Sequence, residues 1–303
     1  MKKLSIISLF ATILLGSCNS GEVPESPYSL ETSTKFAKTI VENTDGYFGH
    51  IKSDVEYNLA PGVSLLDMEY VNAGGYAVRM MVYKVMLGGT ATIAVSTPND
   101  QNTLGTLQPL LEQAEAMDAR AADYVLGAVN GDSFAPLTSQ PNGILYRDGV
   151  AVKTTFNTSN GGFFAMLKDG SAAIFSQEDY SSVRNSIFEA VGTGAQILSE
   201  GYTLPQSDTS AASRTAVGVS ADGTTVYLVA VDGVYFFYSN GITTDDLAAV
   251  MKACGASDAA LLDSGNNTTV VYRNKQETLE VFNTPNNNGI ANPIANGLVV
   301  VAR

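Results

Sequence analysis

The sequence predicts an α+β fold, a single domain of mixed β-sheets covered by a few helices. Short runs in which apolar and polar residues alternate occupy most of the chain, as expected for strands with one buried face. A few longer segments place apolar residues at helical intervals. Neither a long linker nor a fixed-period repeat interrupts residues 49–303. We therefore expect one folded domain over residues 28–303.

The start of the chain is typical of a bacterial lipoprotein export signal. Lys2 and Lys3 precede an apolar run over residues 4–15, which is too short to span a bilayer. The run ends in Gly16-Ser17 directly before Cys18, where lipid transfer and cleavage require a cysteine. We expect a signal peptide over 1–17 and a lipidated tether over 18–27, which would hold the protein at the outer membrane or the periplasmic face of the cell envelope. The alternative is an ordinary secreted protein in which Cys18 is incidental.

The composition excludes several classes of partner. With 45% hydrophobic and 16% charged residues, the chain has the balance of an ordinary folded protein. Removing residues 1–17 takes away two lysines and no acids, so the formal net charge changes from −13 to −15. Such a surface repels nucleic acid and bare anionic lipid. A phosphate group would therefore have to be met by a local positive side chain.

Cysteine and histidine usage narrows the chemistry. Cys254 is the only cysteine besides Cys18, which excludes a disulfide framework, and its apolar surroundings in the sequence predict a small buried hydrophobe. The alternative, a catalytic thiol, would need a histidine nearby. The only histidine, His50, lies away from any serine or acid motif, which argues against serine-histidine triads and histidine-rich zinc sites. Carboxylate acid/base or metal-assisted chemistry remains.

The first half of the chain alternates between helical and strand patterns. Residues 28–44 have the spacing of an amphipathic helix. Alternating runs at 55–59, 76–85 and 90–95 predict strands. A helix is expected over 106–124, where apolar residues recur at helical intervals among residues of high helix propensity.

The second half is mainly strands. Those over 125–175 are separated by glycine turns at Asn142-Gly143, Asp148-Gly149, Gly161-Gly162 and Asp169-Gly170. A short helix is expected within 177–189, and Asp222-Gly223 predicts a hairpin between strands 215–220 and 225–238. Thr243 begins a capped helix that Gly255 ends, and a short buried strand over 259–263 follows.

Three sites combine a strand with a turn that carries an acid or an arginine. They are 128–134 with Asn130 and Asp132, 213–218 with Arg214 paired to 229–233 with Asp232, and 261–269 with Asp263. Each also has an ordinary structural interpretation: Asp132 and Asp232 as turn residues that bond their own backbone, and Arg214 as half of an ion pair. Asp263 ends an apolar run, where an unpaired acid would be costly to bury.

In this order, a larger set of motifs resembles the successive signatures of the phosphodiester glycosidase family. The resemblance spans about residues 76–303 and rests on Asn130-Gly131-Asp132-Ser133-Phe134, Gly143-Ile144-Leu145, Asp148-Gly149, Arg214-Thr215-Ala216-Val217-Gly218, Val231-Asp232-Gly233, 241–255, Leu262-Asp263-Ser264-Gly265 and Asn296-Gly297-Leu298. That family includes the enzyme that removes N-acetylglucosamine from a phosphodiester and so uncovers mannose 6-phosphate.

The resemblance implies a single cleft lined by four catalytic residues, Asp132, Arg214, Asp232 and Asp263. It places Asn130, Gly265, Asn266 and Thr268 beside them as substrate-binding residues. The planar fork of an arginine suits a phosphate, so Arg214 is expected to clamp it. Asp132 and Asp263 would act as general acid and base, or hold a divalent cation such as Ca²⁺ or Mg²⁺ by their oxygens.

This sequence departs from the family pattern at two places. Asn266 and Asn267 stand where the family usually has glycines and serines, and Val234 stands where an arginine often follows the second motif. The expected function is a cell-envelope hydrolase that cleaves a sugar linked through a phosphodiester. The departures motivate an alternative, a glycan-binding surface lipoprotein with a decayed catalytic loop, and a purely structural envelope protein is a third possibility.

Overall fold

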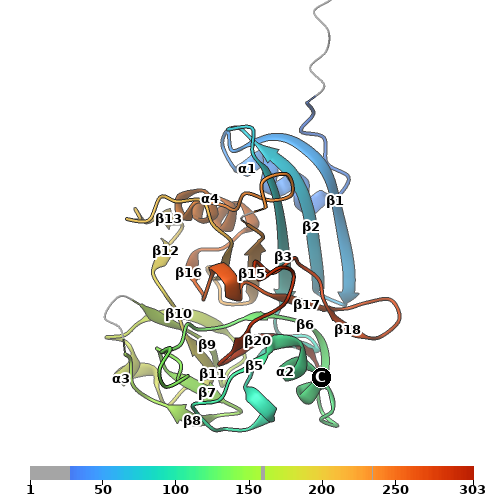
Figure 1. Ribbon diagram of the computed structural model, residues 1–303. Helices are drawn as coiled ribbons and strands as arrows, with labels where there is room; N and C mark the ends of the chain where they lie inside the picture. The colour runs from blue at the N-terminus through green and yellow to red at the C-terminus, as the bar shows by residue number, and fades with distance from the viewer. Residues whose placement is uncertain (1–27, 158–160, 234) are drawn as a thin grey trace, which may run out of the picture.

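A computed structural model describes residues 28–157, 161–233 and 235–303 as one stack of antiparallel sheets with helices on the outside (Figure 1). The predicted signal peptide and the tether with its lipidation site at Cys18 lie outside these residues, as does Val234. No helix of the described chain is both long and apolar enough to cross a membrane.

The largest sheet has eight strands in the order β1-β2-β3-β15-β14-β16-β12-β13. Their bounds are β1 Phe48–Ala60, β2 Val63–Asn72, β3 Ala77–Met86, β12 Gln196–Ser199, β13 Tyr202–Thr203, β14 Arg214–Val219, β15 Thr225–Val231 and β16 Asp258–Leu261. The predicted turn at Asp222-Gly223 joins β14 to β15 and pairs Arg214 with Val231, because Gly223 adopts a positive φ of 70° there.

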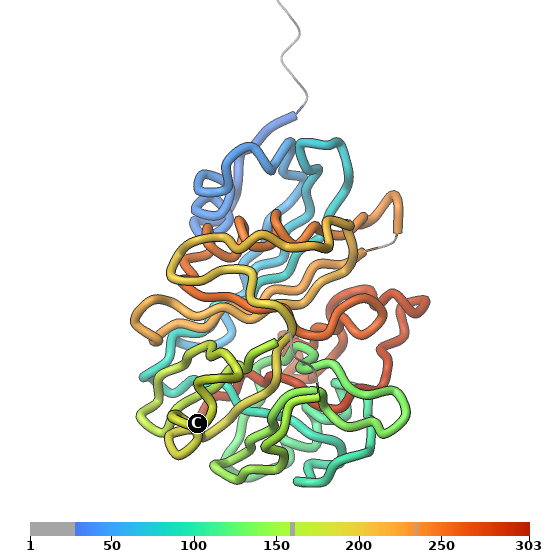
Figure 2. Tube along the Cα trace, turned by 90° about the vertical axis from the view of Figure 1, so that its left-hand side faces the viewer, coloured from blue at the N-terminus to red at the C-terminus, as the bar shows by residue number. Residues whose placement is uncertain are grey.

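Two five-stranded sheets pack below the large sheet, as Figure 2 shows from the side. One has the order β10-β9-β11-β7-β8, with β7 Leu145–Arg147, β8 Val150–Lys153, β9 Gly162–Leu167, β10 Ala172–Ser176 and β11 Ile187–Gly192. The other has the order β18-β17-β6-β20-β4, with β4 Ala91–Ser96, β6 Tyr124–Asn130, β17 Val270–Arg273, β18 Leu279–Val281 and β20 Gly297–Ala302. A small ribbon pairs β5 Gln108–Pro109 with β19 Pro293–Ile294.

The helices cover the outer faces of the stack. They are α1 Lys35–Asn43, α2 Leu110–Asp118, α3 Tyr180–Val183 and α4 Thr244–Cys254, with short 3₁₀ turns η1 Pro98–Asp100 and η2 Gly265–Asn267. α1 and α4 pack on the upper face of the eight-stranded sheet, and α2 packs on the outer face of the sheet that contains β6. Thr243 caps α4 by accepting the Asp246 N–H, and Gly255 ends it in the left-handed region, as predicted.

The main core fills the space between the eight-stranded sheet and the two smaller sheets. Alternate residues of β14 separate the two sides: Ala216 packs toward α4, whereas Val217 packs into the main core. Cys254 is buried on the α4 side, and burial raises the pKa of its thiol to about 12, as expected for an inert buried cysteine.

The predicted α+β class is confirmed in its coarse form, with sheets dominating over short helices. The expectation of mixed sheets is wrong for the described residues, where every strand pairing is antiparallel. The helix expected over 106–124 is shorter because Gln108 and Pro109 pair with β19 instead. The strand expected to continue to residue 238 ends at Val231, and Asp232-Gly233 leads into a loop.

Candidate functional site

The candidate site lies between the eight-stranded sheet, which contains β14, and the five-stranded sheet that contains β6. Strands of the two sheets end side by side there. Hydrogen bonds join the segment after β6 to the segment after β16: the Asp263 N–H donates to the Gly131 carbonyl at 2.9 Å. Asn296, just before β20, accepts the Gly131 N–H on its carbonyl at 3.0 Å and the Asp132 N–H on its side-chain Oδ1 at 2.8 Å. These contacts bring the first and third predicted sites together.

Asp132 occupies a tight cradle made by two glycines. Its Oδ2 accepts the Gly143 N–H at 2.6 Å. A Cβ at Gly192 would lie 2.5 Å from that same Oδ2 and 2.5 Å from the Cα of Gly143. Only glycines therefore let the two backbones close around the carboxyl group. The cradle fixes the orientation of Asp132, which the sequence singled out without its glycine partners.

The environment of Asp132 favours its protonated form. Only 3% of the residue is exposed, and burial raises the pKa of its carboxyl group to about 7 even though the Gly143 N–H bond opposes the shift. The negative charge of Asp263 raises the pKa of Asp132 further. A carboxyl group that carries a proton near neutral pH has the property required of a general acid.

Lys153 is a buried cation close to Asp132. Its Nζ donates to the Gly143 carbonyl at 3.0 Å and also to the carbonyl of Thr155. Its positive charge acts to lower the pKa of Asp132, although burial outweighs this effect. Lys153 thus holds the backbone that forms one wall of the cradle. A lone lysine at the end of a strand gave no sequence signal for this role.

Asp263 is the second carboxylate of the site and is held by its own loop. Its Oδ1 accepts the Ser264 N–H at 2.9 Å, and its Oδ2 accepts the Asn267 side-chain amide at 2.7 Å. Burial raises the pKa of this carboxyl group above its usual value, while these two donors oppose the rise. Asn267, noted in the sequence as a departure from the family pattern, therefore orients Asp263.

The predicted substrate-binding residues divide into two groups. Asn130 is fully buried and braces the site: its Nδ2 donates to the Asp263 carbonyl at 2.6 Å, and its Oδ1 accepts the Thr215 hydroxyl at 2.8 Å. Thr268 is 1% exposed, so its side chain is internal as well. Gly265 and Asn266 lie at the surface of the loop, and Asn266 is exposed. Of the four, these two are accessible to a ligand.

Asp232 lies behind the site and its carboxylate is fully engaged. Oδ1 accepts the Asn283 amide at 2.8 Å, and Oδ2 accepts the Tyr238 hydroxyl at 2.9 Å and the Thr284 N–H at 3.0 Å. Burial raises the pKa of Asp232, which is 1% exposed. Asn283 also donates to the Thr268 carbonyl at 3.1 Å. Three donors thus hold the Asp232 carboxylate next to the segment that carries Thr268, and the catalytic role expected from sequence stays a prediction.

Arg214 pairs with a different acid, Asp208. Because neighbouring residues of a strand point to opposite faces, and Thr215 bonds Asn130, the Arg214 side chain points toward α4. Its Nη2 donates to Asp208 Oδ2 at 2.7 Å and to the Ser210 carbonyl at 2.9 Å. Within the described chain it forms no hydrogen bond or ion pair with any of the three acids. Arg214 is thus not bonded to the site acids, although its neighbour Ser213 donates its hydroxyl to the Gly265 carbonyl in the Asp263 loop at 2.8 Å.

The unpaired polar atoms of the described chain gather at this site. The buried side-chain atoms without a hydrogen-bond partner there are Arg214 Nε, Asn286 Oδ1 and Asn296 Nδ2. Asn296 holds the backbone of Asp132, and the Asn286 amide donates to the Ser213 hydroxyl at 2.6 Å, next to Arg214. Because a buried polar atom without a partner is costly, these atoms are expected to bond water or the polar groups of a ligand.

Metal binding would rely on few acids. Among the described residues no cluster of three or more histidine, cysteine, aspartate or glutamate side chains is arranged to hold an ion. A divalent cation between Asp132 and Asp263 would have to complete its ligand set with amide and carbonyl oxygens and water, which Ca²⁺ accepts more readily than Mg²⁺.

Comparisons with known proteins agree with this architecture. The family model for phosphodiester glycosidases matches residues 123–301. The catalytic domain of zebrafish N-acetylglucosamine-1-phosphodiester α-N-acetylglucosaminidase, described as auto-inhibited by its pro-peptide, is similar in fold, with a TM-score of 0.63 at 19% identity, covering 82% of this chain and 86% of that one.

Two bacterial structures are also similar. A hypothetical protein from Synechocystis has a TM-score of 0.61 at 12% identity, covering 82% of this chain and 64% of that one. An exported protein from Burkholderia pseudomallei has a TM-score of 0.54 at 14% identity, covering 75% and 74%. The curated proteins contain no match to this sequence. Because the family model spans the segments that build the site, from Asp132 to Asn296, this chain belongs to the phosphodiester glycosidase family.

Proposed function

We propose that the protein is a hydrolase that cleaves the glycosidic bond of a sugar linked through a phosphodiester. The observation that carries the proposal is the placement of a buried Asp132, whose pKa is raised to about 7, near a second carboxylate, Asp263, in a family that cleaves this bond. Water is the other reactant. The C1–O bond to phosphate breaks, and the products are the free sugar and a phosphomonoester.

Asp132 acts as the general acid. Its carboxyl group keeps its proton up to about pH 7 and donates it to the departing phosphate oxygen. The Gly143 N–H, at 2.6 Å from Oδ2, stabilises the carboxylate that remains. At 3% exposure, the carboxyl group can donate its proton only to a substrate oxygen that reaches the mouth of the cradle.

Asp263 acts on the opposite side of the reacting carbon. Its two oxygens are oriented by the Ser264 N–H and the Asn267 amide, so the carboxylate can stabilise positive charge at C1 or take a proton from the attacking water. A Ca²⁺ or Mg²⁺ ion, if one binds, would be held by Asp132 and Asp263 and would polarise the phosphate. Proton donation by Asp132 and charge stabilisation by Asp263 require only groups of this chain and water.

Arg214 is the proposed phosphate clamp, and Asp208 now occupies it. An aspartate oxygen 2.7 Å from Nη2 resembles a phosphate oxygen in charge and geometry, and Nε has no partner. Binding of substrate would exchange Asp208 for the phosphate. The Asp208 side chain is 54% exposed, so it can swing into solvent at little cost.

We also propose that the protein works in the bacterial cell envelope, anchored through Cys18. The sequence motif at 15–18 supports this proposal. Metabolic labelling of cells with a radioactive fatty acid tests it. Label in the wild-type protein and none in Cys18→Ser is the expected result, and equal label in both would contradict it.

The test of the enzymatic proposal uses N-acetylglucosamine joined through a phosphodiester to a fluorescent alcohol. The full-length protein should release N-acetylglucosamine, with and without added Ca²⁺ or Mg²⁺, and Asp132→Asn and Asp263→Asn should each lower kcat/KM by about a hundredfold or more. The matched control is Asp222→Asn, an exposed turn residue. Binding of the substrate without product from the wild type would instead support a glycan-binding protein on the same scaffold.

A further inference from the structure

A second groove lies at the opposite end of β6 from the candidate active site. It is bordered by residues 55–59 of β1, by Tyr124 and Leu126 at the start of β6, and by residues 272–277 of the β17–β18 hairpin, and it encloses about 600 Å³. β6 continues from there to Asn130, so about 20 Å of strand separates the groove from the acids. None of the residues in its lining belongs to the candidate active site.

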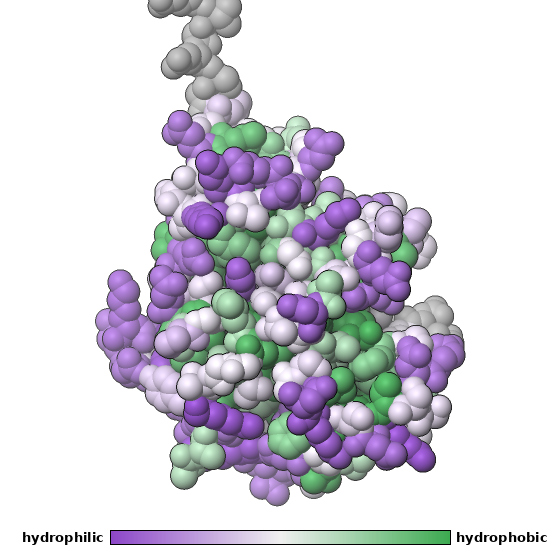
Figure 3. Space-filling model, turned by 180° about the vertical axis from the view of Figure 1, so that it is seen from behind, coloured by the Kyte–Doolittle hydropathy of each residue, from purple (hydrophilic) through white to green (hydrophobic). Residues whose placement is uncertain are grey.

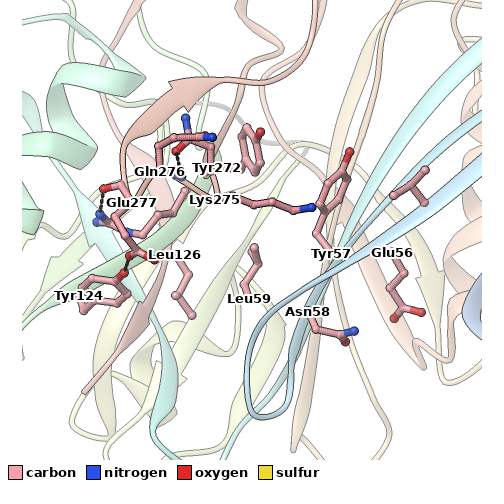
Figure 4. A pocket seen from close by; sticks show the side chains of 13 residues that line it. Glu56, Tyr57, Asn58, Leu59, Tyr124, Leu126, Tyr272, Lys275, Gln276 and Glu277 are labelled. Atoms are coloured by element: carbon pink, nitrogen blue, oxygen red, sulfur yellow. Dashed lines mark hydrogen bonds between the residues drawn. The ribbon is translucent and has the colours of Figure 1, made fainter.

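The groove is lined by aromatic rings above an apolar floor (Figure 4). Tyr57 and Tyr272 pack against each other, with ring centroids 5.9 Å apart, and Leu59 and Leu126 lie between Tyr57 and Tyr124 in this view. Phe282 packs on both tyrosines at 5.8 and 4.4 Å. Since these contacts hold the rings in place, little side-chain entropy is left to lose when a ligand binds.

A third ring extends the lining. Tyr124 is 43% exposed, and Arg273 lies over its ring at 4.2 Å. Its hydroxyl donates to Glu277, so this ring is also fixed. An exposed tyrosine fixed by a cation over one face and by a bond from its hydroxyl offers a preformed flat surface beside the groove.

Polar side chains surround the rings. Asn274 Oδ1 accepts the N–H groups of Gln276 and Thr278, which fixes the hairpin turn. The side chains of Asn58 and Gln276 are exposed at the edge and have no partner within the described chain. Lys275 extends from the turn toward Tyr57 in Figure 4. The groove therefore combines flat rings with unused amide donors and acceptors.

The charged side chains around the groove favour neutral ligands over anionic ones. The acids Glu56 and Glu277 border the groove, and Glu280 lies next to the turn that forms it. Arg273 is paired with Asp118 at 2.5 Å, which leaves Lys275 as the only uncompensated cation of the lining. Anionic ligands such as nucleic acid or a phospholipid headgroup are disfavoured on a chain with a net charge of −13.

We propose that this groove is a non-catalytic binding site for a neutral oligosaccharide. Sugar C–H faces would stack on Tyr57, Tyr272 and Tyr124, and hydroxyls would bond the Asn58 and Gln276 amides. The volume suits a few sugar units. The site rests on the proposed function in one respect, that it would hold a glycan chain while the acids at the other end of β6 act on it.

On the face seen in Figure 3, hydrophobic side chains lie in small groups between hydrophilic ones. Groups of that size are normal on a soluble surface and need no partner. The tyrosine groove differs because its rings come from three strand segments and enclose a volume.

The test is a titration of the full-length protein, labelled with ¹³C on its tyrosine rings, with the trisaccharide of N-acetylglucosamine, followed by NMR. We expect the signals of Tyr57, Tyr124 and Tyr272 to shift. Tyr57→Ala and Gln276→Ala should each weaken binding about five- to tenfold. The matched control is Tyr202→Ala, a tyrosine that is 75% exposed on β13 at the far edge of the large sheet, which should not change binding.

Gln276 is exposed in a turn, so its substitution reports on binding even if Tyr57→Ala loosens the aromatic cluster. Asp132→Asn and Asp263→Asn should retain the tyrosine shifts, which separates this proposal from the enzymatic one. Unchanged affinity in both Tyr57→Ala and Gln276→Ala would overturn the proposal. Shifts caused by an extended peptide and not by the trisaccharide would overturn it as well.

Discussion

Asp132→Asn is the most informative single substitution, because it changes activity and stability through the same carboxyl group. Asparagine keeps the size of the side chain and an oxygen that can accept the Gly143 N–H, now at 2.6 Å from Oδ2. It cannot donate an acidic proton. With Asp132 as the general acid, we expect kcat/KM to fall by about 10²- to 10⁴-fold.

The stability effect follows from the pKa of Asp132. Its value rises from 3.8 to about 7 on folding, so between these values the folded state binds more protons than the unfolded state. Stability must therefore decrease as the pH rises through this window. At about 1.4 kcal/mol per pKa unit, the loss is on the order of 4 kcal/mol, beginning near pH 4 and complete above about pH 7. The neutral asparagine does not incur it.

Two measurements check this reasoning. Urea unfolding at pH 4 and pH 8 should show Asp132→Asn gaining stability relative to the wild type at the higher pH. The kcat/KM of the wild type should fall above about pH 7, the pKa of Asp132, and this fall should be absent from the residual activity of the variant. The assignment would be refuted if kcat/KM of Asp132→Asn still fell above about pH 7. It would also be refuted if the stability difference between variant and wild type were the same at pH 4 and pH 8.

Three further predictions follow from the contacts around the site. Asp208→Asn removes the anion that now pairs with Arg214, so KM for the phosphodiester substrate should fall several-fold in steady-state kinetics. Asn283→Ala leaves Asp232 Oδ1 without its donor at 2.8 Å and should lower the free energy of unfolding by about 1–3 kcal/mol in urea titrations. Gly192→Ala places a Cβ 2.5 Å from the buried catalytic carboxyl group, so kcat should fall at least about tenfold, as single-turnover kinetics would show.

Control variants separate these effects from a general loss of stability. Arg214→Ala should raise KM, whereas Asp208→Asn should lower it. Equal KM values in the two variants would show that Arg214 does not bind the phosphate. Gly170→Ala changes a glycine turn with open space around it, so kcat should stay unchanged while stability falls slightly from its positive φ of 88°. Loss of kcat in this variant as large as in Gly192→Ala would show that the cradle has no special role.

Local signals predicted the elements correctly where a single residue type decides the conformation. Thr243 and Gly255 bound α4 because a side-chain oxygen and a left-handed glycine satisfy the free ends of any helix. The turn at Asp222-Gly223 is similar, since Asp222 Oδ1 accepts the Thr224 N–H inside the turn itself. The length of α2 depended instead on pairing with β19, about 185 residues further along the chain, which no local pattern contains.

The sequence singled out the acids of the candidate site but not the residues that surround them. Asp132 and Asp263 stand at strand ends, where a carboxylate is conspicuous against an apolar run. Lys153 and Gly192 act through contacts made only after folding, so nothing in their own sequence neighbourhood marks them. The sequence does not show to which face of the sheet the Arg214 side chain points. Strand alternation fixes that face only once Thr215 is known to point at Asn130.

The central claim is that this site breaks the bond between a sugar and a phosphate oxygen. Hydrolysis of N-acetylglucosamine-1-phosphodiester in water enriched in ¹⁸O tests it directly, because the heavy oxygen marks the atom that water attacks. Mass spectrometry should find the label in the released N-acetylglucosamine and none in the phosphomonoester. Label in the phosphate, or no release of sugar by the wild-type protein, would contradict the account.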